Sequence, residues 1–125
     1  MAHASQTRRV PRTGFHSVTP RLVVVDVAWQ AEFLRRVFDA VGTVVAGQPV
    51  EMRIGDSLIM ISETDEREMF PAFLYIYVDD ADKVCQRAVS AGATVIEHPF
   101  DTPYGDRRGM VQDPLGNVFQ VAHVI

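Results

Sequence analysis

The sequence predicts an α+β fold built from two βαβββ modules that are related by a pseudo-twofold axis. Stretches with the two-residue period of strands alternate with two stretches of helical period, and the order strand–helix–strand–strand–strand occurs twice. The repeat is also visible in residues, because LVVVD (22–26) and YIYVD (75–79) are each followed by a predicted helix that ends near a glycine. Each sheet must bury one face, so we expect curved mixed sheets with the helices on their outer faces.

The first module spans about residues 16–65. A β-branched run predicts its first strand over 18–25, and apolar residues at helical spacing predict a helix over 28–41. Asp26 is a suitable N-cap for this helix, and Gly42 is a plausible stop. Short apolar runs between turn residues predict three further strands, over 43–46, 50–54 and 58–62.

The second module spans about residues 70–125, after an acidic connector over 63–71. Asp79 and Asp80 are expected to cap a helix that runs to about Ala91, where Gly92 ends it. The prolines between Pro99 and Gly105 predict a loop. The strands of this module are expected over 72–78, 93–97, 107–112 and 118–124.

Length and charge limit the kind of protein. A chain of 125 residues is one domain, and residues 1–15 form a basic N-terminal tail ahead of the single domain over 16–125. Beyond the tail the chain is acidic, which argues against nucleic-acid binding. The acidity slightly favours a cationic ligand, although ordinary solubility charge is the stronger interpretation. No apolar run reaches the length of a membrane span, and no signal peptide is visible. The single Cys85 excludes an internal disulfide and fits a reducing cytoplasm, so we expect a cytoplasmic protein.

Strand alternation predicts which side chains face away from the helices, on the inner, concave faces of the sheets. This inner set is apolar with a few polar tips, and it includes an aromatic ladder on the strand over 72–78. Such a surface suits an organic ligand, although a filled second core with hydroxyls at its rim would use the same residues. The expected inner-face residues are Thr19, Arg21, Met60, Phe73, Tyr75, Tyr77 and Gln120.

Two segments resemble the vicinal oxygen chelate (VOC) superfamily, which has the glyoxalase/bleomycin resistance/dioxygenase fold, and within it the PhnB-like branch. They are VTPRLVVVD…AEFLRRVF and YVDDADKVCQRAVSAGATVIEHPFDTPYGDRRGMVQDPLGNVFQVAH. The likeness covers about residues 16–125. The Ala-Gly-Ala helix end, the Tyr-Gly-Asp-Arg loop and the Asp-Pro-x-Gly-Asn turn carry most of it.

The resemblance implies four metal-ligand positions, which fall on Thr19, Met60, Phe73 and Gln120. A threonine is a poor ligand, and a methionine and a phenylalanine offer nothing to a hard cation. Only Gln120 retains an oxygen donor. We therefore expect no metal and no cofactor.

The leading hypothesis is a metal-free member of this superfamily that binds an aromatic or apolar organic ligand, as in antibiotic sequestration. Trp29 is expected to stack on the ligand with the aromatic ladder, and Tyr104 and Arg108 to add minor contacts from an overhanging loop. The resemblance also implies a homodimer, and we expect neither a nucleic-acid nor a membrane partner. Two alternatives stay open: a metal-dependent glyoxalase-like lyase, isomerase or ring-cleaving dioxygenase, and a non-catalytic interaction subunit.

Overall fold

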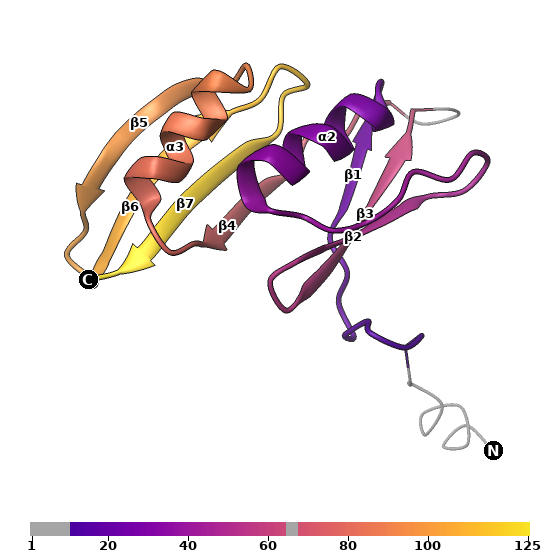
Figure 1. Ribbon diagram of the computed structural model, residues 1–125, viewed down its shortest axis with the longest axis horizontal. Coiled ribbons are helices and arrows are strands. Elements are labelled where there is room, and N and C mark those ends of the chain that lie inside the picture. Colours follow the sequence, from indigo (N-terminus) through magenta and orange to yellow (C-terminus); the bar gives the residue numbers. More distant parts are fainter. Residues whose placement is uncertain (1–10, 65–67) are drawn as a thin grey trace.

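The computed structural model describes residues 11–64 and 68–125, which form two mixed sheets and two helices (Figure 1). The first sheet has the strand order β1-β3-β2, and the second has the order β4-β7-β6-β5. In each sheet the first strand of the module pairs in parallel with the last, as β1 with β3 and β4 with β7. This confirms the predicted α+β class. The elements are β1 (Arg21–Val24), α2 (Val27–Phe38), β2 (Val50–Ile54), β3 (Ser57–Glu63), β4 (Phe73–Tyr77), α3 (Ala81–Ser90), β5 (Thr94–Asp101), β6 (Asp106–Gln112) and β7 (Val118–Val124).

The first module has one strand fewer than predicted. Residues 43–46 form no strand, and a single bridge between Val41 and Arg53 is all that joins this stretch to β2. Val44 and Val45 are both exposed, so an extended segment here would bury no side-chain face. β-propensity reflects such packing more than a backbone preference, which is why two valines did not suffice.

The helix starts follow the predicted caps, but the end of α2 does not. Asp26 accepts a hydrogen bond from the Trp29 N–H at 3.0 Å, and Asp80 accepts one from the Lys83 N–H at 3.1 Å. α2 ends at Phe38, because Asp39 adopts the left-handed conformation that short polar residues tolerate (φ 56°). Gly42 has another role: a Cβ there would lie 2.4 Å from the Glu51 carbonyl oxygen.

β5 continues through the stretch that was predicted as a loop. It reaches Asp101 and includes Pro99, with register shifts between Val95 and Glu97 and between Glu97 and Phe100. A proline is tolerated here because β5 is an edge strand that pairs only with β6.

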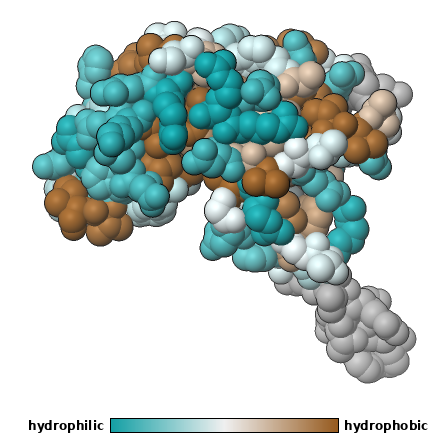
Figure 2. Space-filling model, in the orientation of Figure 1, coloured by the Kyte–Doolittle hydropathy of each residue, from teal (hydrophilic) through white to brown (hydrophobic). Residues whose placement is uncertain are grey.

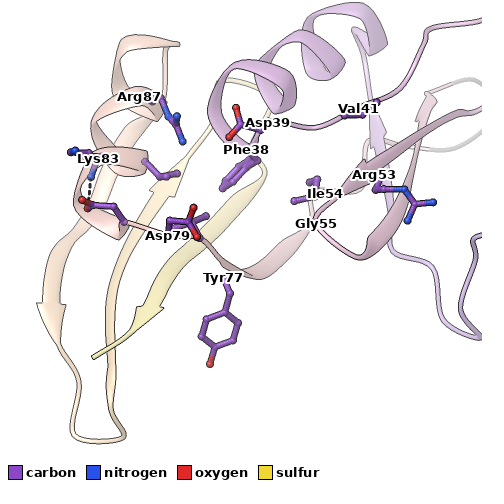
Figure 3. Close-up of a pocket in the computed structure, with 13 residues that line it drawn as sticks. Phe38, Asp39, Val41, Arg53, Ile54, Gly55, Tyr77, Asp79, Lys83 and Arg87 are labelled. Atoms are coloured by element: carbon purple, nitrogen blue, oxygen red, sulfur yellow. Dashed lines mark hydrogen bonds between the residues drawn. The ribbon is translucent and has the colours of Figure 1, made fainter.

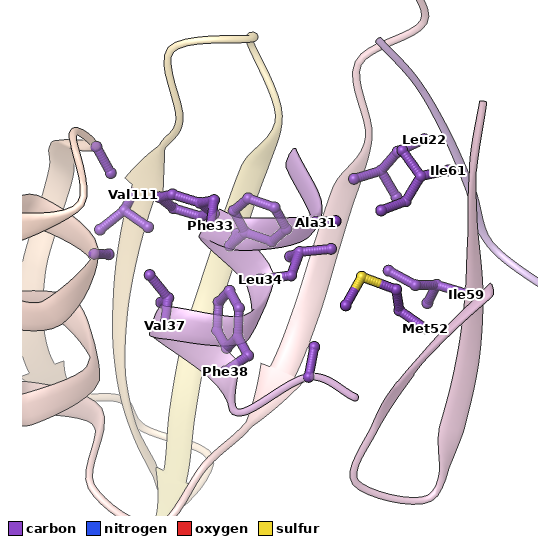
Figure 4. Packing of buried hydrophobic residues seen from close by; sticks show 14 of the residues in the cluster. Leu22, Ala31, Phe33, Leu34, Val37, Phe38, Met52, Ile59, Ile61 and Val111 are labelled. Atoms are coloured by element: carbon purple, nitrogen blue, oxygen red, sulfur yellow. The ribbon is translucent and has the colours of Figure 1, made fainter. Parts of the chain in front are cut away.

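The main core surrounds α2, which lies between the two sheets (Figures 1 and 4). Phe33 and Phe38 contact Phe119 of β7, with ring centroids 5.9 and 5.3 Å apart. The predicted alternation is confirmed on this side of both sheets, although Val23 and Ala122, which alternate onto the inner faces, are buried as well. The buried helix-facing strand residues include Leu22, Val24, Ile59, Ile61, Phe119 and Val121.

A buried polar network joins the last turn of the chain to α2 and to β4. Gln30 donates to Asp113 at 2.9 Å, and Asn117 donates to the Gln30 carbonyl at 2.8 Å. The Ala72 N–H donates to the Asn117 side-chain oxygen at 2.9 Å. All three polar side chains are buried, so their mutual hydrogen bonds offset the cost of removing them from water. The DPLGN turn therefore ties the two modules together.

The outer surface over α3 is mostly hydrophilic, and a hydrophobic patch lies at the C-terminal end of the second sheet, where Val124 and Ile125 are exposed (Figure 2). Of the predicted basic tail, residues 1–10 lie outside the described residues, as do residues 65–67 of the acidic connector. Arg12 pairs with Glu51 of β2 at 2.9 Å, so the end of the tail contacts the first sheet. None of the described helices is long and apolar enough to cross a bilayer.

Candidate ligand-binding site

The inner face of the second sheet presents an aromatic ladder, which we define as Phe73, Tyr75 and Tyr77 of β4. Their side chains are 66%, 38% and 61% exposed, whereas the alternate residues Leu74 and Ile76 pack against the core. Figure 3 shows Tyr77 pointing away from both helices. Three adjacent aromatic side chains without a covering layer form an exposed, largely apolar surface.

A buried carboxylate holds the two tyrosines of the ladder in place. The Tyr75 and Tyr77 hydroxyls both donate to the same oxygen of Asp106, at 2.6 and 2.8 Å. Asp106 is only 5% exposed and lies two strands away on β6. Asp106 pairs with Val124 of β7, and the next residue of that strand on the same face is Ala122, which pairs with Tyr77 on one side and Arg108 on the other. Its methyl group leaves room for the phenol rings to reach across β7.

Thr102 fixes the start of β6, and with it the position of Asp106. The Thr102 hydroxyl donates to the Asp106 carbonyl at 2.7 Å and accepts from the Asp106 N–H at 3.1 Å. The intervening residues 103–105 form the turn that carries Tyr104 to the rim of the sheet. The Tyr104 hydroxyl lies 3.5 Å from that of Tyr75.

Arg108 borders the ladder on the same face. Its guanidinium donates to Glu97 at 2.6 Å and to the Tyr104 hydroxyl at 3.2 Å, and it lies 5.1 Å from the centroid of the Phe100 ring. The Arg108 Nε is buried and has no hydrogen-bond partner among the described residues. The structure thus groups Tyr104 and Arg108 with the ladder.

The hydrogen bonds to Asp106 help to raise the pKa values of the Tyr75 and Tyr77 hydroxyls. Burial, and then the hydrogen bond to Asp106, raise the pKa of Tyr75. The hydrogen bond to Asp106, and then desolvation, raise the pKa of Tyr77. Both groups therefore remain protonated donors at neutral pH, and neither is activated as a base.

Gln120 lies on β7 between the ladder and β6, where it pairs with Tyr75 on one side and Met110 on the other. It is partly exposed, and none of the hydrogen bonds found for the described side chains involves it. Its amide can therefore contact a ligand that lies on the ladder.

The structure separates the other predicted site residues from the ladder. Trp29 lies on α2 and stacks on Phe33, with ring centroids 5.2 Å apart, so it belongs to the helix side of the fold. Thr19 precedes β1, and Arg21 lies on the inner face of the first sheet, where its guanidinium contacts the Met60 sulfur at 3.4 Å. In one chain the two inner faces point in different directions, as the side chains of Arg53 and Tyr77 show (Figure 3).

The four positions that the superfamily uses for a metal do not fit one here. Thr19 and Met60 lie with the first sheet, while Phe73 and Gln120 lie on the second. Of these side chains, only those of Thr19 and Gln120 carry an oxygen donor, and both are neutral. In the described part of the chain, no three His, Cys, Asp or Glu side chains are grouped so that they could hold a metal ion.

Two hollows adjoin the ladder. A cavity of about 280 Å³ separates the β2–β3 turn from β4 and is lined by Pro20, Ile54, Tyr75 and Tyr77 among others. A larger hollow of about 670 Å³ lies on the helix side, between the end of α2 and the start of α3 (Figure 3). Three acidic and three basic residues line this hollow, so its charges cancel. One of the basic residues, Arg87, donates a hydrogen bond to the Val37 carbonyl oxygen at 3.1 Å. The smaller cavity therefore suits an extension of an apolar ligand better.

The comparisons with known proteins agree with this architecture. The profile of the Glyoxalase/Bleomycin resistance protein/Dioxygenase superfamily matches residues 14–121. An uncharacterized protein of Mycobacterium bovis is 32% identical over 120 aligned residues, which cover 81% of this chain and 78% of that protein. A putative glyoxylase, CFP32 of Mycobacterium bovis, is 42% identical over only 48 residues, 38% of this chain and 18% of that protein.

Solved structures show the same fold at low identity. A glyoxalase/bleomycin resistance protein/dioxygenase family enzyme from Burkholderia phytofirmans superposes with a TM-score of 0.72 at 23% identity, covering 84% of this chain and 95% of that one. TioX from a Micromonospora species gives a TM-score of 0.71 at 20% identity, with 86% and 95% covered. The fold and the site define a two-module protein with an open inner sheet face. The chain belongs to the glyoxalase/bleomycin resistance/dioxygenase (VOC) superfamily.

Proposed function

We propose that this protein is a metal-free binder of a small organic ligand, aromatic or apolar, which lies on the inner face of the second sheet. The observation that carries the proposal is the exposed aromatic ladder. Proteins rarely leave three adjacent aromatic side chains uncovered unless the surface contacts something else. A flat ligand would stack on Phe73, Tyr75 and Tyr77, and Gln120 and Arg108 would orient its polar end.

The absence of a suitable donor set supports binding without metal chemistry. Divalent metals require several nitrogen or oxygen donors that converge on one point, and the residues at the superfamily positions do not supply them. The Asp106 carboxylate is already occupied by two phenol hydroxyls on one of its oxygens. Binding a ligand without reacting with it requires neither a metal ion nor a catalytic side chain.

Membership of the PhnB-like branch and assembly as a homodimer are both part of the proposal. In one chain neither inner face has a facing layer, and a second copy could place the first-sheet residues Arg21 and Met60 over the ladder. The free thiol of the buried Cys85 supports a cytoplasmic location.

Calorimetric titration with acridine, a flat neutral probe, tests the proposal. We expect saturable binding that Phe73→Ser weakens by about three- to tenfold, the size of one aromatic contact. Phe70→Ser is the matched control, because Phe70 is as exposed but lies before β4. No acridine binding, or equal losses in both variants, would show that the ladder is not a ligand site.

A further inference from the structure

Among residues 11–64 and 68–125, no basic side chain forms an ion pair with the Asp106 carboxylate. Asp106 is 5% exposed. Buried charges in proteins are usually paired, because an isolated charge loses its hydration without compensation. Arg108, the cation nearest in sequence on the same face, is paired with Glu97 at 2.6 Å.

The directions of the hydrogen bonds determine which atoms a ligand would contact at the Tyr75 and Tyr77 hydroxyls. The Tyr75 and Tyr77 hydrogens both point into Asp106, so the outer sides of these two oxygens present lone pairs. The Tyr104 hydroxyl lies 3.5 Å from that of Tyr75, and either could donate to the other. Arg108 donates to the Tyr104 oxygen. The Tyr75 and Tyr77 hydroxyls therefore offer acceptors on their outer sides.

The aromatic rings would also attract a cation. The Tyr75 and Tyr77 ring centroids lie 5.4 Å apart at an interplanar angle of 58°, and ring faces attract cations through their quadrupole. A phenol that donates to a carboxylate becomes richer in electrons, which strengthens this attraction. The chain beyond the tail is also acidic, with 9 basic and 16 acidic residues after the first 14.

We infer that the ligand of this site is a flat organic cation, such as a protonated ring amine, for which Asp106 is the counter-ion acting through Tyr75 and Tyr77. The inference rests on the proposed function, since it names the class of ligand that the ladder takes. A cation placed on the two phenols would neutralise the buried charge. It would also satisfy their lone pairs with its N–H donors.

Three acridines of similar area test the inference: 9-aminoacridine, which is a cation at neutral pH, neutral acridine, and anionic acridine-9-carboxylate. Calorimetry should show about tenfold tighter binding of the cation than of acridine, and the weakest binding for the anion. This series uses only the unaltered protein, so it decides the question even if a variant fails to fold. Equal or tighter binding of the neutral or anionic acridine would overturn the inference and leave the proposed function standing. Binding of none of the three would overturn both.

Asp106→Asn then assigns the preference to one residue. Both phenols can still donate to the amide oxygen, so we expect the ratio of the 9-aminoacridine affinity to the acridine affinity to fall from about ten to about one. Asp101→Asn is the matched control, because it removes the same charge from the neighbouring strand, where Asp101 pairs with Arg107 instead. Loss of the preference in both variants, or in neither, would show that Asp106 is not the counter-ion.

Discussion

Asn117 connects three parts of the chain through its side chain alone. Its amide donates to Gln30 of α2, and its carbonyl accepts from the N–H that precedes β4. Asn117→Ala would leave a buried acceptor and a buried donor without partners, so we expect the free energy of unfolding to fall by about 2–3 kcal/mol. Urea denaturation measures this. Gln112→Ala, at an exposed position of β6, serves as the control and should change stability little.

The Cys85 thiol makes the free energy of unfolding depend on pH in the alkaline range. Burial raises the pKa of its thiol from 9.0 to about 11. Between these values only the unfolded chain releases the proton, so stability is full below pH 9 and declines as the pH rises towards 11. Tyr75 acts in the same direction, because its pKa is also raised.

Urea denaturation of the protein and of Cys85→Ala over this pH range tests the assignment. The variant should lose less stability between pH 9 and pH 11 than the unaltered protein does. Identical pH dependence in the two proteins would contradict a role for the thiol.

Gln120 occupies a position that corresponds to a metal ligand in the superfamily, but the side chains at the other three ligand positions do not complete a metal site. Gln120→Glu restores a carboxylate, but Met60 and Phe73 still provide no oxygen or nitrogen donor. We expect this variant to bind no zinc, nickel or iron at stoichiometric level, as measured by elemental analysis after dialysis. One equivalent of bound metal that depends on the new carboxylate would refute this reading of the site.

Alternation along the strands was enough to predict the inner-face position of Tyr75, Tyr77 and Gln120, because side chains in a strand point to opposite faces. Asp106 was missed. It stands beside two arginines in DRRG, whereas its partners are two tyrosines more than 25 residues away. A polar residue that alternates onto an inner face opposite tyrosines is the signal that could have found it.

Among the elements, helix α3 lies against β6 so closely that Gly109 has no room for a side chain. A Cβ on Gly109 would lie 2.7 Å from the Cys85 sulfur and 3.1 Å from the Pro99 ring. Gly109→Ala should therefore lower the free energy of unfolding by about 1–3 kcal/mol, the usual cost of overpacking.

A double-mutant cycle with Cys85→Ala identifies the contact that causes the loss. Removing the sulfur makes room for the new methyl group, so the double variant should recover part of the stability that Gly109→Ala loses. Simple addition of the two losses would mean that Pro99 or the backbone, and not Cys85, limits the packing.

Both helices and seven of the eight expected strands could be predicted, because helix and strand periods differ and the Asp26 and Asp80 caps are local signals. The end of α2 could not, because Asp39 stops the helix by a left-handed conformation that glycine more often adopts. The missing strand over 43–46 depends on tertiary packing, since nothing covers Val44 and Val45. The local sequence does not specify whether another part of the chain packs on these two valines.

The relative placement of the two modules is also absent from local patterns. Alternation assigned Arg21, Met60 and the ladder to inner faces, but α2 lies between the sheets and turns those faces apart in one chain (Figure 1). Arg21 with Met60, and the ladder, therefore form two separate half-surfaces. Sedimentation of the protein alone and with acridine shows whether a second copy closes them.

A crystal structure with 9-aminoacridine would show directly where the ligand binds. We expect the acridine ring system within about 4 Å of the Tyr75 and Tyr77 rings, with no metal ion beside Gln120. Acridine bound in the helix-side hollow near Arg87, or a metal ion coordinated on the inner face, would contradict this expectation.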